Sequence, residues 1–270
     1  MQKRSLSFYL LAAFFGLFVC FLYGPMIAIF VLSLQGPEGG LMFPVKGFSF
    51  HWLGQVFQEQ RVGNFVEAFQ RSLILGVVIA LLAIVIGVAA SMAFRQRFRG
   101  SRPLFYLTIS SLVVPGTLIS LGIGISFEEV LKIQTNWFSS GIGAHLTWTV
   151  PFAFLILIGV FNRFNPSYEE AARDLGASDI TTFKEIVLPL IFPGLIGIGI
   201  LTFTLSYDEF VRTSLVSGQY NTLPLEVFGM TTNVTSPALY ALGTLTTLFS
   251  FSMIAIAYTL YRRFSRQQRS

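Results

Sequence analysis

Two adjacent carboxylates, Asp208 and Glu209, are the residues of this 270-residue chain whose types and spacing best suggest chemistry. They follow Tyr207 and a series of hydroxyl side chains that includes Thr204, at the end of an apolar run. Carboxylates beside an aromatic ring suit an organic cation, through ion pairing and cation–π contact. We therefore expect Asp208, Tyr207 and Thr204 to line a polar pathway, with a smaller part for Glu209, which points elsewhere on a helix.

A second aromatic residue, Trp148, precedes Pro151 in another apolar run. A proline bend frees backbone polar groups, so Trp148 is a further candidate for the pathway. The alternative is an ordinary membrane interface, where tryptophan gathers and where Arg212 pairs with Asp208 or Glu209 at helical spacing. The sequence leaves both interpretations open.

Enzymatic chemistry is poorly supplied in this chain. Neighbouring side chains on a helix diverge by about 100°, so Asp208 and Glu209 do not converge on one substrate atom. The single cysteine, Cys20, and two distant histidines, His51 and His145, offer no nucleophile–base set. We expect His145 to be a hydrogen-bonded interface residue. A membrane-embedded enzyme is therefore the weaker of two hypotheses, and transport is the stronger.

The composition is that of an integral membrane protein. Apolar residues form 53% of the chain and charged residues 11%, whereas soluble domains carry about 25% charged residues. The net charge of +5 is therefore a poor sign of nucleic-acid binding. A helix needs about 20 apolar residues to cross the bilayer. We expect one domain, residues 1–270, with six spans at about 8–34, 72–94, 103–127, 144–161, 186–207 and 238–261.

The first apolar run is too long for a signal peptide, and we expect an uncleaved helix bent at Gly24-Pro25. Thirteen lysines and arginines lie in the N-terminus, the 95–102 loop, the 162–185 segment and the C-terminal tail, and five lie elsewhere. Because basic residues favour the cytoplasmic side, both termini are predicted to be cytoplasmic. The basic loops then lie at anionic membrane lipid.

Two outer connections have some helical character. Residues 64–71 mix aromatic and charged side chains and are expected to form a surface helix that leads into the second span. Residues 221–233 are either a short outer helix or a re-entrant element, and the sequence leaves that choice open.

The cytoplasmic segment 162–185 is built like two short helices joined by a glycine. Ser167 and Glu170 have the spacing of a capping box. Gly176 stands where a left-handed residue closes a helix, and Ser178 or Asp179 can cap the next helix. Such a rigid element on a membrane protein suggests a docking surface. Because Glu169, Glu170, Asp174 and Asp179 would face anionic lipid unfavourably, we expect a protein partner.

One pattern in this segment resembles a known family. Glu170-Ala171-Ala172, Gly176 and Ile186-x-Leu188-Pro189 match the EAA signature of bacterial ABC importer permeases at every defined position. The resemblance extends over most of the chain and is closest to the second permease of spermidine/putrescine importers. It is carried by residues 95–100, 168–178 and 201–218.

The resemblance implies an all-α integral membrane protein with the type I ABC importer permease fold, in the bacterial inner membrane. Its six transmembrane helices would have a coupling helix between spans four and five. The implied partners are a second permease in a heterodimer, a cytoplasmic ATPase dimer and a periplasmic substrate-binding protein. The implied ATPase-coupling residues are Glu169, Glu170, Ala171, Ala172, Asp174, Gly176 and Ala177.

No phosphate-binding loop of the form G-x-x-x-x-G-K-[ST] occurs in the sequence. We therefore expect ATP and magnesium to be bound by the partner ATPase, and no cofactor in this chain. The resemblance implies a polyamine or another small organic amine as substrate, with an opine or an amino-acid-like solute as the alternative. A carrier driven by an ion gradient is less favoured, because such carriers usually show an internal repeat.

Overall fold

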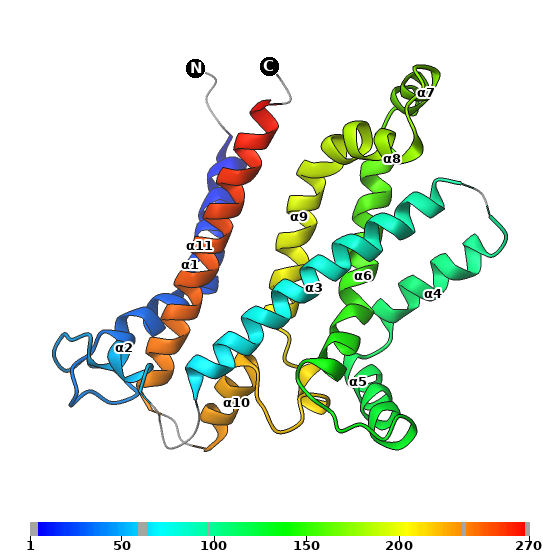
Figure 1. The fold of residues 1–270 in the computed structure, drawn as a ribbon. Coiled ribbons are helices and arrows are strands. Elements are labelled where there is room, and N and C mark those ends of the chain that lie inside the picture. Colours follow the sequence, from blue (N-terminus) through cyan, green and yellow to red (C-terminus); the bar gives the residue numbers. More distant parts are fainter. Residues whose placement is uncertain (1–4, 59–63, 97, 234–235, 268–270) are drawn as a thin grey trace. The chain divides into compact units, whose positions relative to one another are not determined.

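The computed structural model describes residues 5–58, 64–96, 98–233 and 236–267. The chain forms two compact units, one from residues 1–65 and 227–251 and the other from residues 66–226 and 252–270. Both are helical, and the described residues contain one isolated β-bridge, Gln35 to Phe48. Figure 1 shows the helices in chain order. The predicted all-α membrane class is confirmed.

The first unit begins with a long apolar helix. Helix α1 (Leu6–Ser33) runs without a break through Pro25, where a bend was expected. Most of its leucines and phenylalanines are exposed, as suits a helix whose surroundings are lipid or other chains. A short helix, α2 (His51–Gln55), follows in the connection. The hydroxyl of Tyr240, on α11 (Ala238–Gln267), donates to the carbonyl of Leu41 in that connection over 2.7 Å.

Five stretches of the described chain are long and apolar enough to cross a membrane as single helical segments. They are α1, α3 (Phe65–Phe94), α6 (Ser139–Phe161), residues 179–207 and residues 238–256. Each coincides with a predicted span, although α6 begins five residues before the expected 144–161. Residues 65–71 are not a separate surface helix but the first two turns of α3, because neither glycine nor proline interrupts them. The terminal residues 1–4 and 268–270, with part of the basic charge used to orient the chain, lie outside the described residues.

The third predicted span, 103–127, falls on two helices separated by a sharp bend. The structure has α4 (Ser101–Val113) and α5 (Gly116–Ile125), the latter continued by a π-helical turn η1 (Ser126–Val130). The two parts are bent by 104° at the break. The physical cause is Pro115, whose ring keeps the preceding residue out of the helical region. Val114 accordingly has φ −66° and ψ 131°.

The core of the second unit is built by α3, α6 and α9 (Leu188–Tyr207). Small residues let these helices approach closely, as is usual in membrane bundles. A side chain at Gly87 would lie 3.0 Å from the Cβ atom of Ala153, and one at Gly76 would lie 2.9 Å from the Phe203 ring. The buried apolar cluster on these helices and on the residue just before α9 consists of Ala83, Ala153, Leu157, Phe161, Val187, Ile191, Leu195 and Ile198.

The segment before α9 contains the two short helices that were expected. Helix α7 (Ser167–Asp174) is followed by α8 (Asp179–Thr182) and the π-helical turn η2 (Phe183–Val187). Gly176 has φ +86°, and the Ser178 hydroxyl accepts from the backbone N–H of Thr181 over 3.2 Å, so both of these predictions are confirmed. Figure 1 shows α7 and α8 at one end of α6 and α9, with α5 at the other end.

The predicted capping box of Ser167 and Glu170 is wrong. Pro166 already has helical dihedral angles, with φ −60° and ψ −25°, so the chain enters the helix one residue earlier. The Asn165 side chain takes the capping role by accepting from the N–H of Ser167 over 3.1 Å. Residues 223–233, for which the sequence left an outer helix or a re-entrant element open, form an α-helix, α10 (Leu223–Asn233).

Candidate functional site

The candidate pathway lies where α9 ends. The helix stops at Tyr207, and Asp208 caps it with φ −100° and ψ 10°. The chain then turns through Glu209 and Arg212 into a 3₁₀ turn, η3 (Thr213–Leu215). Asp208 and Glu209 therefore leave the helix, and the structure places them in different surroundings, with Asp208 exposed and Glu209 buried.

Glu209 is neutralised within the chain. Its Oε1 accepts from the backbone N–H of Arg212 over 2.7 Å, and its Oε2 lies 3.6 Å from Nη1 of Arg212. The exposed fractions of the two residues are 6% and 8%. The pairing of Arg212 with Glu209 is one that the sequence left open, and the pair is buried within the chain.

The guanidinium of Arg212 also lies over the Trp148 ring, the aromatic group that was a candidate for binding a cation. Its Cζ atom lies 4.6 Å from the ring centroid of Trp148, on α6. A side chain at Gly116, the first residue of α5, would lie 3.0 Å from Nη1 of Arg212. The guanidinium therefore joins α6, the start of α5 beyond the bend, and the turn after α9.

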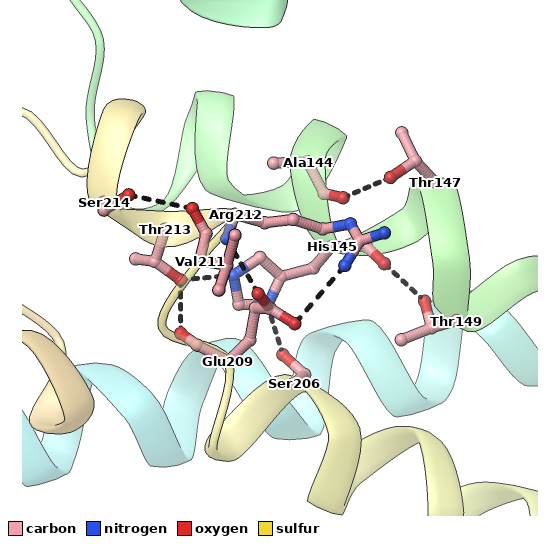
Figure 2. A network of polar contacts seen from close by, with 10 residues as sticks. All are labelled: Ala144, His145, Thr147, Thr149, Ser206, Glu209, Val211, Arg212, Thr213 and Ser214. Atoms are coloured by element: carbon pink, nitrogen blue, oxygen red, sulfur yellow. Dashed lines mark hydrogen bonds and ion pairs between the residues drawn. The ribbon is translucent and has the colours of Figure 1, made fainter. Parts of the chain in front are cut away.

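His145 is the centre of a second buried network, which Figure 2 shows beside Glu209 and Arg212. Its Nδ1 lies 2.7 Å from the Ser206 hydroxyl and its Nε2 lies 2.8 Å from the Thr213 hydroxyl. The Thr213 hydroxyl donates its proton to the carbonyl of Glu209 over 2.7 Å. Its oxygen therefore accepts from Nε2–H of His145, and a neutral imidazole satisfies the network. His145 is hydrogen-bonded, as expected, and it is buried.

The remaining pathway candidates divide by exposure. Thr204 and Asp208, one turn apart, are both exposed, and the N–H of Asp208 donates to the carbonyl of Thr204 over 3.2 Å. Tyr207 is buried, with its ring stacked on that of Phe203 at a centroid distance of 5.7 Å. The protein around the Asp208 carboxyl excludes enough water to raise its pKa above the ordinary value. Of the two adjacent carboxylates, Asp208 is the exposed one and Glu209 is the buried one.

The predicted coupling residues lie on or beside α7, which buries none of its residues. Glu170, Ala171, Asp174 and Gly176 are exposed, whereas Ala172 and Ala177 are partly buried. Glu169 points back toward α3, where Arg95 donates to it over 2.9 Å. Of the two adjacent glutamates, Glu169 is therefore paired with an arginine and Glu170 is exposed. The same difference separates Glu209 from Asp208.

The contacts of three residues in these sites were not predicted from the sequence. Arg95 was counted only as a basic residue of a loop, and its partner is 74 residues away in the sequence. Ser206 and Thr213 are ordinary hydroxyl residues until the fold brings them to His145, 61 and 68 residues away. No local pattern marks such contacts.

Comparison with known proteins gives consistent results. Residues 83–267 match the family model described as binding-protein-dependent transport system inner membrane component. The spermidine/putrescine transport system permease protein PotC of Haemophilus influenzae is 29% identical over 95% of this chain and 98% of its own length. The putrescine transport system permease protein PotI of Escherichia coli is 30% identical over 83% of this chain and 81% of its own length. A chain of a bacterial ABC transporter involved in alginate import has the same fold, with a TM-score of 0.73 at 16% identity over 96% of this chain and 95% of its own.

Proposed function

The chain belongs to the family of binding-protein-dependent transport system inner membrane components, and from this premise we propose that it imports a polyamine as one permease subunit of an ATP-driven transporter. Relatives named for spermidine and putrescine transport match it over most of its length. The observation within the structure that best supports a cationic substrate is the exposed carboxylate of Asp208.

The charges around Asp208 favour this residue over its neighbour. Glu209 is neutralised by Arg212, and the Trp148 ring is covered by the same guanidinium. A second cation would gain little at either group, because it would meet the positive charge of Arg212 first. Asp208 and the neighbouring Thr204 hydroxyl remain on the exposed face. We assign the ammonium contact of this chain to Asp208, with Thr204 beside it, and give Tyr207 a packing role.

The exposed face of α7 supports an ATPase partner. It presents the carboxylates of Glu170 and Asp174. Leu175, at the end of α7, and Ile180, in α8, are 90% and 69% exposed. Apolar side chains beside charged ones in a connecting segment are typical of a protein contact surface. We assign this surface to a cytoplasmic ATPase dimer that binds ATP and magnesium, because the sequence has no phosphate-binding loop.

The remaining parts of the assembly follow from the family and from the charge distribution. We infer a second permease that completes the pathway and a periplasmic binding protein that delivers the substrate. The distribution of basic residues favours cytoplasmic termini in the inner membrane of a bacterium. That orientation puts α7 on the same side as the ATPase.

The experiment measures uptake of radiolabelled spermidine and putrescine by proteoliposomes that contain the complete transporter. ATP is supplied on the side of the membrane that carries the ATPase. Asp208→Asn should lower uptake by roughly tenfold, the loss of one charge-assisted contact. Glu129→Gln is the matched control, because Glu129 is an exposed carboxylate whose ion-pair partner, Lys132, lies three residues away in the sequence. Uptake of both amines that is unaffected by Asp208→Asn would remove Asp208 from the pathway, and absence of any ATP-driven polyamine uptake would refute the substrate class.

A further inference from the structure

Arg95, the residue after the end of α3, is held from several sides. Its Nη1 donates to Oε1 of Glu169 over 2.9 Å, and its Nη2 donates to Oε2, so the guanidinium and the carboxylate meet in parallel. Its Cζ atom lies 5.1 Å from the ring centroids of both Phe161 and Phe164. The side chains of Arg95 and Glu169 are 23% and 14% exposed. Such a bidentate, partly shielded pair has one defined geometry.

The pair joins a poorly buried helix to a well-packed one. Helix α7 buries none of its own residues, and its Arg173 forms an ion pair with Asp179 of the neighbouring α8. Helix α3, by contrast, contributes to the apolar core with α6 and α9, and Phe161 of that core lies directly beside Arg95. A movement of α7 that keeps the Arg95–Glu169 pair intact must therefore also move the end of α3.

The other end of α3 reaches the candidate pathway. Nε of Arg71 donates to the carbonyl of Asn221 over 2.7 Å, and the Ser72 hydroxyl accepts from the N–H of Leu223 over 2.9 Å. The Phe69 ring meets that of Tyr207 edge-on, at a centroid distance of 6.2 Å. One continuous helix is thus linked to α7 at one end, through Arg95 just beyond it, and contacts the two sides of the turn after α9 at the other.

We propose that Arg95 is a positioning residue that transmits the movement of α7 to α3, and through α3 to the turn that carries Asp208. The proposal rests on the proposed function, since it concerns how an ATPase that docks on α7 drives the pathway. It also gives the two glutamates of α7 separate roles. Glu170, which is exposed, meets the ATPase, and Glu169 is the internal joint of the coupling.

The test compares ATP hydrolysis with uptake in the reconstituted, complete transporter. Arg95→Glu and Glu169→Arg should each lower the amount of polyamine taken up per ATP hydrolysed by roughly tenfold, while hydrolysis continues. The double variant with both substitutions restores opposite charges and should recover much of the ratio. Arg99→Glu, which reverses an exposed arginine in the same loop, is the control and should leave the ratio unchanged.

A milder pair of variants covers the case in which charge reversal prevents assembly. Glu169→Gln should lower uptake per ATP, whereas Glu170→Gln should lower the stimulation of hydrolysis by the loaded binding protein. A merely structural role of Arg95 would instead reduce assembly, hydrolysis and uptake together, with uptake per ATP unchanged. That result, or a normal ratio in both single variants, would overturn the inference. A wild-type complex that hydrolyses ATP without polyamine uptake would show separately that the proposed function is wrong, and the inference would fall with it.

Discussion

Replacement of Arg212 by methionine is expected to destabilise the chain strongly, because it leaves a buried carboxylate without its counter-charge. Glu209 is 6% exposed, and its Oε2 lies 3.6 Å from the guanidinium. At that distance, and with an effective dielectric constant of about 20, Coulomb's law gives about 4–5 kcal/mol. Loss of one partner from a buried ion pair costs about 3–5 kcal/mol in general. The contact of Arg212 with Trp148 adds about 0.5–2 kcal/mol to what is lost.

We therefore expect Arg212→Met to lower the free energy of unfolding by about 3–5 kcal/mol. The second substitution, Glu209→Gln, removes the orphaned charge and keeps a side-chain oxygen that can accept from the backbone N–H of residue 212, which donates to Oε1 of Glu209 over 2.7 Å in the unsubstituted chain. The double variant should regain about half of the loss or more, as neutral replacements of buried pairs usually do. Lys132→Met breaks an exposed pair whose side chains are both 72% exposed, and it should cost at most about 1 kcal/mol.

The assay is reversible unfolding of the purified chain in mixed detergent micelles, followed by circular dichroism as the fraction of denaturing detergent rises. A double variant as unstable as Arg212→Met alone would refute the reasoning, because the cost would then come from lost packing and not from an unpaired charge. A loss no larger than that of Lys132→Met would show that the pair is not shielded from water.

Three further outcomes are expected. Gly87→Val should weaken the contact of α3 with α6 by about 1–3 kcal/mol, measured in the same unfolding assay, because its Cβ would lie 3.0 Å from that of Ala153; a neutral effect would mean that the helices separate easily. Gly176→Ala should cost about 1 kcal/mol, since its φ of +86° disfavours a side chain, and unchanged ATPase coupling and stability would show that the turn relaxes. The pKa of Asp208 is raised above the 3.8 of an ordinary aspartate, so its carboxylate takes up a proton at a higher pH than an ordinary aspartate does. Polyamine uptake should therefore decline as the pH falls toward the raised pKa of Asp208. A decline that persists in Asp208→Asn would show that another group titrates.

The sequence predicts much of the helical framework, because the framework depends on local properties. Charge-free runs of sufficient length mark the spans, and a glycine at the end of a helical pattern marks the left-handed turn at Gly176. The break in the third span also has a local signal, Pro115, which predicts an extended residue before it. Its 104° bend is not local, since the angle depends on what packs against α5, including Arg212 at Gly116.

The capping of α7 shows how a local prediction can miss by one residue. The spacing of Ser167 and Glu170 satisfies the capping-box pattern. The pattern assumes that the residue before the helix is extended, whereas Pro166 is compatible with the first helical turn and starts it early. Asn165, which can cap a helix equally well, then takes the position that the pattern gave to Ser167.

The candidate sites were harder to predict, for a reason that both pairs of adjacent acids share. In each pair one carboxylate is neutralised by an arginine of the same chain and the other stays exposed: Glu209 with Arg212, and Glu169 with Arg95. The first arginine is three residues away and visible as a helical spacing, but the second is 74 residues away and visible only in the fold. Charge alone therefore does not identify the functional member of a carboxylate pair. Within the part of the chain that the structure describes, Asp208 and Glu170 form no ion pair, and these are the members that we expect to meet a substrate and an ATPase.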